Sequence, residues 1–301
     1  MDISECCADN GASGCKTTVA CAPGYQMCPP GAFGDHGPQF HVRDASCTIN
    51  DPNGPIYDPV YGVYHLHYQN HVGLDGGRTW GHAVSKDLSQ WAHLPISIWN
   101  DQPYDSTTIA SGSGTVVNGK IIQVYPGICN KTVTLCIAVP ADPSDPLQTN
   151  WSKTWVKNPI SGVRPGWGSA GDPSTAWKTS FGEWRLNTQG ACVGSMDFKT
   201  WYPIGTTPGF PHGEDPSFFP LPKTTPGATV TPSDPKPTHV HKISHGGDHI
   251  IMAYARWHVH RGSRKNCGEL HRHTRYYSWA ERDKDRQGFL FRKQGLLRPS
   301  K

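Results

Sequence analysis

Three acidic side chains carry the most chemical information in this sequence. Asp51, Asp172 and Glu214 each stand one or two positions before a proline, in stretches typical of tight turns. Taken singly, each acid is best explained as a carboxylate that caps a turn. If the three turns lie at the same end of neighbouring sheets, the carboxyl groups converge, and they repel one another unless one holds a proton. Such a set can supply one nucleophile and one acid, as in retaining glycosidases, whose two carboxyl groups lie about 5 Å apart.

The elements that must position these acids have the pattern of β-strands. The run Tyr64-His65-Leu66-His67-Tyr68-Gln69 alternates with a period of two, which predicts a strand. Asp51 is therefore expected at the end of a strand, on a turn built by proline and glycine. Sheet proteins commonly hold reactive side chains on loops of this kind, braced by rigid strands.

A short motif recurs along the chain and indicates a repeated architecture. Ser-x-Asp-x-x-x-Trp occurs at residues 85–91 and 195–201, and residues 147–151 resemble a degenerate middle copy. The spacing of roughly fifty to sixty residues is typical of propeller blades, each a small antiparallel sheet. Chance recurrence in a tryptophan-rich chain is the alternative. The repeat is favoured because the motif follows a strand pair each time.

In combination, these motifs resemble glycoside hydrolase family 32, the invertases, inulinases, levanases and fructan-metabolising enzymes. The resemblance extends from about residue 40 to about residue 252 and rests on Ile49-Asn50-Asp51-Pro52-Asn53-Gly54, Tyr64-His65-Leu66-His67-Tyr68-Gln69, Trp80-Gly81-His82-Ala83-Val84-Ser85, Ser111-Gly112-Ser113, Asp172-Pro173 and Glu214-x-Pro216-x-Phe218-Phe219-Pro220. It implies an all-β fold, a five-bladed β-propeller followed by a β-sandwich. It also implies retaining hydrolysis of terminal β-D-fructofuranosyl residues of sucrose or fructans, with no cofactor and no metal.

The resemblance also implies a role for each site residue. Asp51 corresponds to the nucleophile, Glu214 to the acid/base and Asp172 to the residue that stabilises the charged transition state. Hydrogen bonds to the fructose are expected from three further side chains, Asn50, Gln69 and Ser111. Trp80 is expected either to line the substrate pocket or to pack a blade.

Three positions depart from the family pattern. Gly171 stands where the family usually has arginine before the transition-state aspartate, Asp215 where it has cysteine after the acid/base, and Ala110 where it often has phenylalanine. The loss of the arginine removes a charge-assisted contact. Two alternatives to a hydrolase therefore stay open: a fructosyltransferase that uses the same intermediate, and a catalytically defective sugar-binding homologue.

The length of 301 residues bounds the architecture. It is too short for five blades and a sandwich, so about four blades are expected, with the sandwich missing. The expected division is a Cys-, Gly- and Pro-rich segment at 1–38, an incomplete catalytic propeller at 39–290 and a basic tail at 291–301. A partner chain is one way to close the ring.

Charge and cysteine content limit partners and location. From residue 256 onward the chain carries thirteen Lys or Arg against four Asp or Glu, while the whole chain has a net charge of +4. No aromatic platform accompanies this basic segment, so neither a nucleic-acid nor a membrane partner is expected. Ten cysteines predict disulfides and an extracellular, vacuolar or secretory location, although no signal peptide is visible. Cys129 and Cys136 are candidates for a bridge across a hairpin.

Overall fold

The computed structural model describes an all-β chain, as the sequence predicts. The described residues are 42, 44, 49–160, 170–205, 213–220, 239–245, 249–255, 257–258, 269–270, 275–282 and 289–293. They form strands and one short 3-10 helix, η1 (Leu74–Gly76). No helix in this part of the chain is long and apolar enough to cross a membrane. The chain divides into two compact units, residues 1–160 and 161–301, and each is described by itself.

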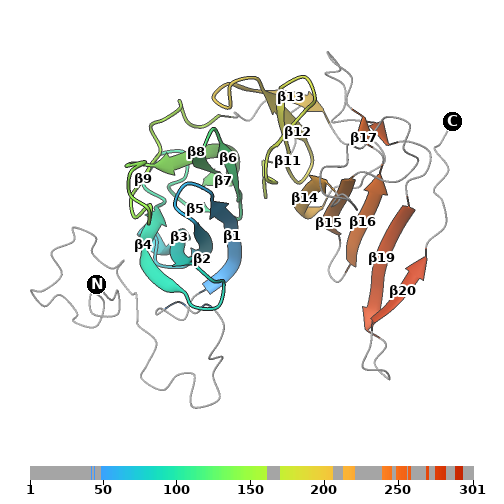
Figure 1. Ribbon diagram of the computed structural model, residues 1–301, viewed down its shortest axis with the longest axis horizontal. Helices are drawn as coiled ribbons and strands as arrows, with labels where there is room; N and C mark the ends of the chain where they lie inside the picture. Colours follow the sequence, from blue (N-terminus) through green and yellow to red (C-terminus); the bar gives the residue numbers. More distant parts are fainter. Residues whose placement is uncertain are drawn as a thin grey trace, which may run out of the picture. The chain divides into compact units, whose positions relative to one another are not determined.

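The first unit contains two antiparallel sheets (Figure 1, blue to green). The first sheet has the strand order β1-β2-β3-β4. Its strands are β1 (Ile49–Asp58), β2 (Val63–Asn70), β3 (Thr79–Ser85) and β4 (Ala92–Ile98). The second sheet has the order β5-β7-β8-β9, with β6 also paired to β7. Its strands are β5 (Thr108–Ile109), β6 (Ser113–Val117), β7 (Lys120–Cys129), β8 (Thr132–Pro140) and β9 (Trp151–Ser152).

The second unit contains two further sheets and a small ribbon (Figure 1, yellow to red). The first is formed by β10 (Trp177–Lys178), β11 (Trp184–Asn187), β12 (Cys192–Ser195) and β13 (Trp201–Gly205), in that order. The next is formed by β14 (Glu214–Pro220), β15 (His239–His245), β16 (His249–Ala255), β19 (Arg275–Arg282) and β20 (Phe289–Lys293). The ribbon pairs β17 (Trp257–His258) with β18 (Glu269–Leu270). Four sheets of blade size are thus described, in agreement with the predicted propeller type and blade number.

The recurring motif forms the same turn in two sheets, which confirms the repeat. In each copy the aspartate Oδ1 accepts from its serine hydroxyl, at 3.1 Å, and from two backbone N–H groups. The tryptophan Nε1 donates to the carbonyl of Leu88 in one copy and of Phe198 in the other. These two residues have positive φ angles of 64° and 63°. The motif therefore encodes a left-handed residue three positions before a tryptophan at the start of the next strand: Trp91 immediately precedes β4, and Trp201 begins β13.

The middle copy keeps the backbone conformation but changes the bonds. Gln148 has a φ of 50° and again lies three residues before a tryptophan, Trp151. Here the turn is held by Asp145, which accepts from the backbone N–H groups of Leu147 and Thr149 at 2.9 and 2.8 Å. The copy is degenerate in sequence because the capping carboxylate has moved two positions toward the N-terminus.

A stack of three buried histidines fills the centre of the first sheet. Nδ1 of His65 lies 3.0 Å from Nε2 of His82, and the rings of His67 and His82 stack at 4.2 Å. Nδ1 of His67 lies 2.9 Å from the Ser97 hydroxyl, which donates its proton to the Trp80 carbonyl. His67 therefore carries its proton on Nδ1. All three rings are at most 1% exposed.

Burial keeps these histidines neutral. Desolvation lowers the pKa of His65 to about 4, against the opposing charges of Asp58 and Asp145. Desolvation lowers the pKa values of His67 and His82 well below their usual range, and the neighbouring histidines lower them further. The first sheet is thus built around imidazoles that cannot ionise without disrupting their packing.

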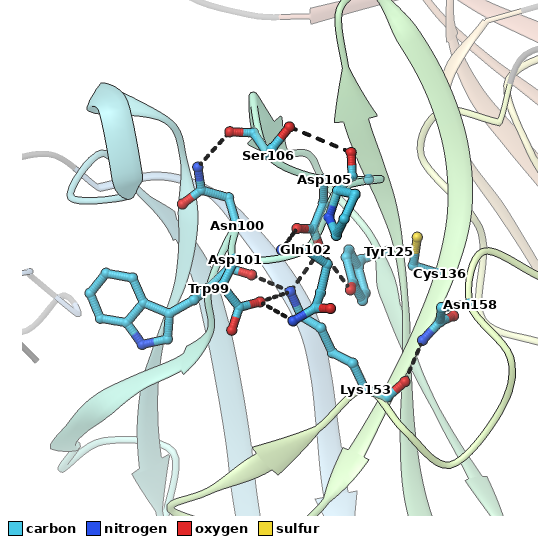
Figure 2. Close-up of polar contacts among 12 residues, drawn as sticks. Trp99, Asn100, Asp101, Gln102, Asp105, Ser106, Tyr125, Cys136, Lys153 and Asn158 are labelled. Carbon is cyan, nitrogen blue, oxygen red and sulfur yellow. Dashed lines mark hydrogen bonds and ion pairs between the residues drawn. The ribbon is translucent and has the colours of Figure 1, made fainter. Parts of the chain in front are cut away.

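A buried ion-pair network fixes the loop between the first two sheets (Figure 2). The Lys153 ammonium contacts the carboxylates of Asp101 and Asp105, each at 2.7 Å, and donates to the Trp99 carbonyl. Asp105 is fully buried and also accepts from the Tyr125 hydroxyl at 3.1 Å. Burial raises the pKa of Asp105, and the Lys153 charge acts against this rise. The loop leads directly into β5 and Ser111, so the network contributes to the placement of Ser111.

The histidine stack predicts acid-sensitive stability. Below pH 6.5 the unfolded chain binds protons that the folded sheet excludes, so the free energy of unfolding should fall as pH drops toward about 4. The slope should approach about 1.4 kcal/mol per pH unit for each histidine. Urea unfolding between pH 7 and pH 4.5 measures this pH dependence of the free energy of unfolding. His82→Gln should reduce the slope by about one proton. Equal slopes in the wild-type protein and the variant would contradict the assignment.

The Lys153 network predicts a large cost for losing its cation. Lys153→Met leaves the buried Asp105 carboxylate uncompensated and should lower the free energy of unfolding by roughly 3–5 kcal/mol. Adding Asp105→Asn should restore part of that loss, because no charge then remains buried. The exposed Lys86→Met is the control and should change stability by less than about 0.5 kcal/mol. Denaturant unfolding gives the free energy of unfolding of the four proteins. A Lys153→Met variant as stable as the wild type would contradict the prediction.

Candidate active site

Asp51 lies within β1 rather than on the expected turn, and one of its carboxylate oxygens is held by Gln69 of the adjacent strand β2 and by Ser111, between β5 and β6. Oδ2 accepts from the Ser111 hydroxyl at 2.6 Å and from Nε2 of Gln69 at 3.1 Å. Gln69 Nε2 also donates to the Ser111 oxygen at 2.7 Å. Among the described residues, no hydrogen bond to Oδ1 is found. The structure therefore brings together three predicted site residues and leaves one oxygen of Asp51 available.

Arg78 fixes the orientation of Gln69 and was not predicted from the sequence. Its Nη1 donates to Gln69 Oε1 at 3.0 Å, and its Nε donates to Thr108 Oγ1 at 3.2 Å. Because a guanidinium can only donate, the oxygen of the Gln69 amide must face Arg78 and the nitrogen must face Asp51. The only sequence signal was the place of Arg78, at the end of the glycine-rich segment between β2 and β3.

The Asn50-Asp51-Pro52-Asn53-Gly54 stretch joins the first two sheets. Gly54 N donates to the Gly112 carbonyl at 3.1 Å, and Gly112 N donates to Oδ1 of the buried Asn53 at 3.2 Å. Gly54 has a φ of +47°, and a Cβ there would lie 2.0 Å from Oε1 of Gln123. The positive φ and this close approach both favour glycine at this position. Asn50 lies at the exposed end of β1, where its Oδ1 is 2.8 Å from Nε2 of His71.

Trp80 has the packing role among its two expected roles. Its indole is fully buried with Ile98, Ile109 and Tyr125. Its Nε1 donates to the Ala110 carbonyl at 3.1 Å, directly before Ser111. Trp80 thus helps to hold the segment that carries Ser111.

Asp172 lies in the second unit and is held by Gln189. Gln189 Nε2 donates to Asp172 Oδ2 at 2.6 Å, and Asp215 N donates to the same oxygen at 3.3 Å. Asp172 and Asp215 have positive φ angles of 45° and 49°, a conformation that aspartate tolerates better than most residues. Gln189 was not singled out in the sequence. The one sequence feature that marks Gln189 is its place in a Thr-Gln-Gly turn between two strands.

Glu214 begins β14 and is exposed. It pairs with Ser244 of β15, and a register shift follows before Ser217 pairs with Lys242. The Lys242 ammonium donates to the Asp215 carbonyl at 3.4 Å and to the Ser244 hydroxyl at 3.2 Å. The backbone of Asp215 thus connects Glu214 to both Asp172 and Lys242.

The expected convergence of all three acids stays a prediction. Asp51 belongs to the first unit, and Asp172 and Glu214 belong to the second. Within the described ranges, no group of three or more His, Cys, Asp or Glu side chains is placed to hold a metal ion.

The predicted Cys129–Cys136 bridge is wrong, because both thiols are free. In the β7–β8 register Cys129 pairs with Thr132, while Cys136 pairs with Tyr125. The two cysteines are therefore offset by four positions along the ladder, roughly 13 Å. Disulfide bonds require Cα atoms less than about 7 Å apart. The five cysteines in the first 28 residues lie outside the described residues.

Comparison with known proteins identifies the family. Residues 41–266 match the model of the glycosyl hydrolases family 32 N-terminal domain. The chain is 38% identical over 224 residues to the vacuolar acid beta-fructofuranosidase 4 of Arabidopsis thaliana, covering 68% of this chain and 33% of that protein. It is 42% identical over 165 residues to sucrose:sucrose 1-fructosyltransferase of Festuca arundinacea, covering 52% of this chain and 24% of the relative.

A solved structure agrees with the sequence matches. Fructan 1-exohydrolase IIa from Cichorium intybus superposes with a TM-score of 0.56 and 27% identity, covering 90% of this chain and 47% of that one. The chain therefore belongs to glycosyl hydrolase family 32, whose N-terminal domain the matched region represents. It spans about a third of the length of the first curated relatives that it matches.

The geometry at Gly54 predicts a specific cost for a side chain. Gly54→Ala adds both a positive-φ penalty and a clash with buried Gln123, so it should lower the free energy of unfolding by roughly 2–4 kcal/mol. Gly119→Ala is the matched control: φ is +78°, but the nearest atom to its Cβ is Val60 Cγ2 at 3.7 Å. It should show the φ penalty of about 1–2 kcal/mol alone. Urea unfolding compares them, and equal losses would show that the contact with Gln123 is not a constraint.

Proposed function

We propose that this chain carries the catalytic site of a retaining glycosidase that releases terminal β-D-fructofuranosyl residues from sucrose or fructans. The observation that supports it most is the state of Asp51 within the matched family domain. Ser111 and Gln69 hold Oδ2 of its carboxylate, and Oδ1 has no hydrogen bond among the described residues. This orientation suits an in-line attack by Oδ1.

In the proposed mechanism Asp51 Oδ1 attacks the anomeric carbon of fructose and forms a fructosyl ester. Glu214 donates its proton to the leaving glycosidic oxygen as the bond to the anomeric carbon breaks. Glu214, now ionised, accepts a proton from a water molecule, whose oxygen attacks the same carbon and releases Asp51. Asp172 stabilises the positive charge that develops on the sugar ring in both steps.

A fructosyltransferase is the second candidate. The relative from Festuca arundinacea supports it, because its name gives that activity and it is 42% identical to this chain. The two reactions share the fructosyl-enzyme and differ only in the acceptor, water or a sugar hydroxyl. Product analysis therefore separates them, whereas the acids of the site do not.

Turnover by the purified chain tests the proposal. Sucrose, inulin and levan are each incubated with the wild-type protein and with Asp51→Asn, which removes the nucleophile while preserving shape. Wild type should release fructose, and the variant should be slower by roughly 10³-fold or more. Fructose-containing oligomers without matching free fructose would identify the transferase. No turnover of any of the three sugars by folded wild-type protein would overturn the proposal and favour a sugar-binding homologue.

We also propose that the protein works in the vacuole or outside the cell. The Arabidopsis thaliana relative is named vacuolar, and ten cysteines suit an oxidising compartment. Cys129 and Cys136 are free thiols. Thiol titration of the denatured, unreduced protein should therefore find at least two thiols. Ten free thiols would refute the proposal.

A further inference from the structure

We infer that Gln189 is the positioning residue for Asp172, and that Gly171 is the residue that makes this possible. The inference rests on the proposed function for its kinetic consequence and on the second unit's own contacts for its geometry. It concerns the position at which the sequence departs from its family by lacking an arginine.

The first step is the space above Gly171. A Cβ built on Gly171 would lie 2.6 Å from both Cδ and Oε1 of Gln189 and 3.0 Å from Nε2. Carbon atoms do not approach so closely, so any side chain at 171 must displace the Gln189 amide. The amide of Gln189 therefore occupies the volume that the first side-chain atom at position 171 would take.

The second step is what the amide does there. Its Nε2 donates to Asp172 Oδ2 at 2.6 Å, a charge-assisted hydrogen bond. The backbone holds Gln189 in place on both sides: Gln189 N donates to the Gly171 carbonyl at 3.0 Å, and Gly213 N donates to the Gln189 carbonyl at 3.3 Å. The contact is thus built by three segments of the second unit.

The third step is the state of Asp172. This residue has a φ of 45°, a conformation that costs a non-glycine residue free energy, although aspartate less than most, and that contacts in the folded unit help to hold. Its Oδ2 accepts from Gln189 and, at 3.3 Å, from the backbone N–H that follows Glu214. Gln189 therefore couples the conformation of Asp172 to the start of β14. A neutral amide thus contributes to holding Asp172 through a short contact.

The kinetic test uses two single variants and their combination. Gln189→Ala removes the donor, and Gly171→Ala pushes the amide aside, which is possible because the clash is with the far end of a flexible side chain. Each should reduce kcat/KM for sucrose by roughly 10- to 100-fold, the effect of losing one hydrogen bond to a charged group. The double variant should be no slower than Gln189→Ala alone, because both changes remove the same contact. Gln90→Ala, at an exposed turn, should match wild type.

The second measurement does not depend on turnover. The side-chain amide resonance of Gln189, assigned by its loss in Gln189→Ala, is followed by ¹⁵N-resolved NMR. It should move in Gly171→Ala and in Asp172→Asn and stay unchanged in Gln90→Ala. An unmoved resonance, additive kinetic losses, or wild-type activity in Gln189→Ala would overturn the inference. If folded wild type turns over no fructoside, the proposed function fails, and the NMR comparison alone decides whether Gln189 positions Asp172.

Discussion

The hydrogen bond between Ser111 and Asp51 is the constraint on which the first unit depends. It joins β1 of the first sheet to the segment between β5 and β6 of the second at 2.6 Å, and a backbone hydrogen bond joins Gly54 to Gly112 of the same segment. Two sets of contacts help to place Ser111. Trp80 bonds to the residue before it, and the Lys153 network fixes the loop that leads into β5. The hydrogen-bonded arrangement around Asp51 therefore depends on the contact between the two sheets, and no single sheet could supply it.

The blade turns show which parts of the fold are predictable from sequence. Ser-x-Asp-x-x-x-Trp is a local code: serine and aspartate bond to backbone groups two or three residues away, so the turn needs nothing from the rest of the chain. Its two copies can therefore be recognised in the sequence. The middle copy is harder to recognise, because Asp145 caps the turn from a shifted position, although Gln148 also has a positive φ.

Contacts between distant segments were harder to predict. The motif positions Asp51, Gln69 and Ser111 were identified through the family pattern, and the structure unites them. Arg78, Lys153 and Gln189 were not, because no local spacing reveals their partners. Those partners lie 9 and 30 positions away for Arg78, 48 to 54 for Lys153 and 17 for Gln189. The Cys129–Cys136 prediction failed for a related reason: closeness in sequence across a hairpin does not fix the ladder register that decides which residues face each other.

The departure at Gly171 changes how a missing motif residue should be interpreted. A glycine in place of an arginine suggests a thinned site if each position is judged alone. In the folded unit, the same glycine admits a side chain from the turn between β11 and β12, and that side chain donates to Asp172. The donor has thus come from another segment. In the proposed reaction, the neutral amide orients Asp172 without adding a positive charge of its own, which suits a carboxylate that stabilises a positively charged transition state.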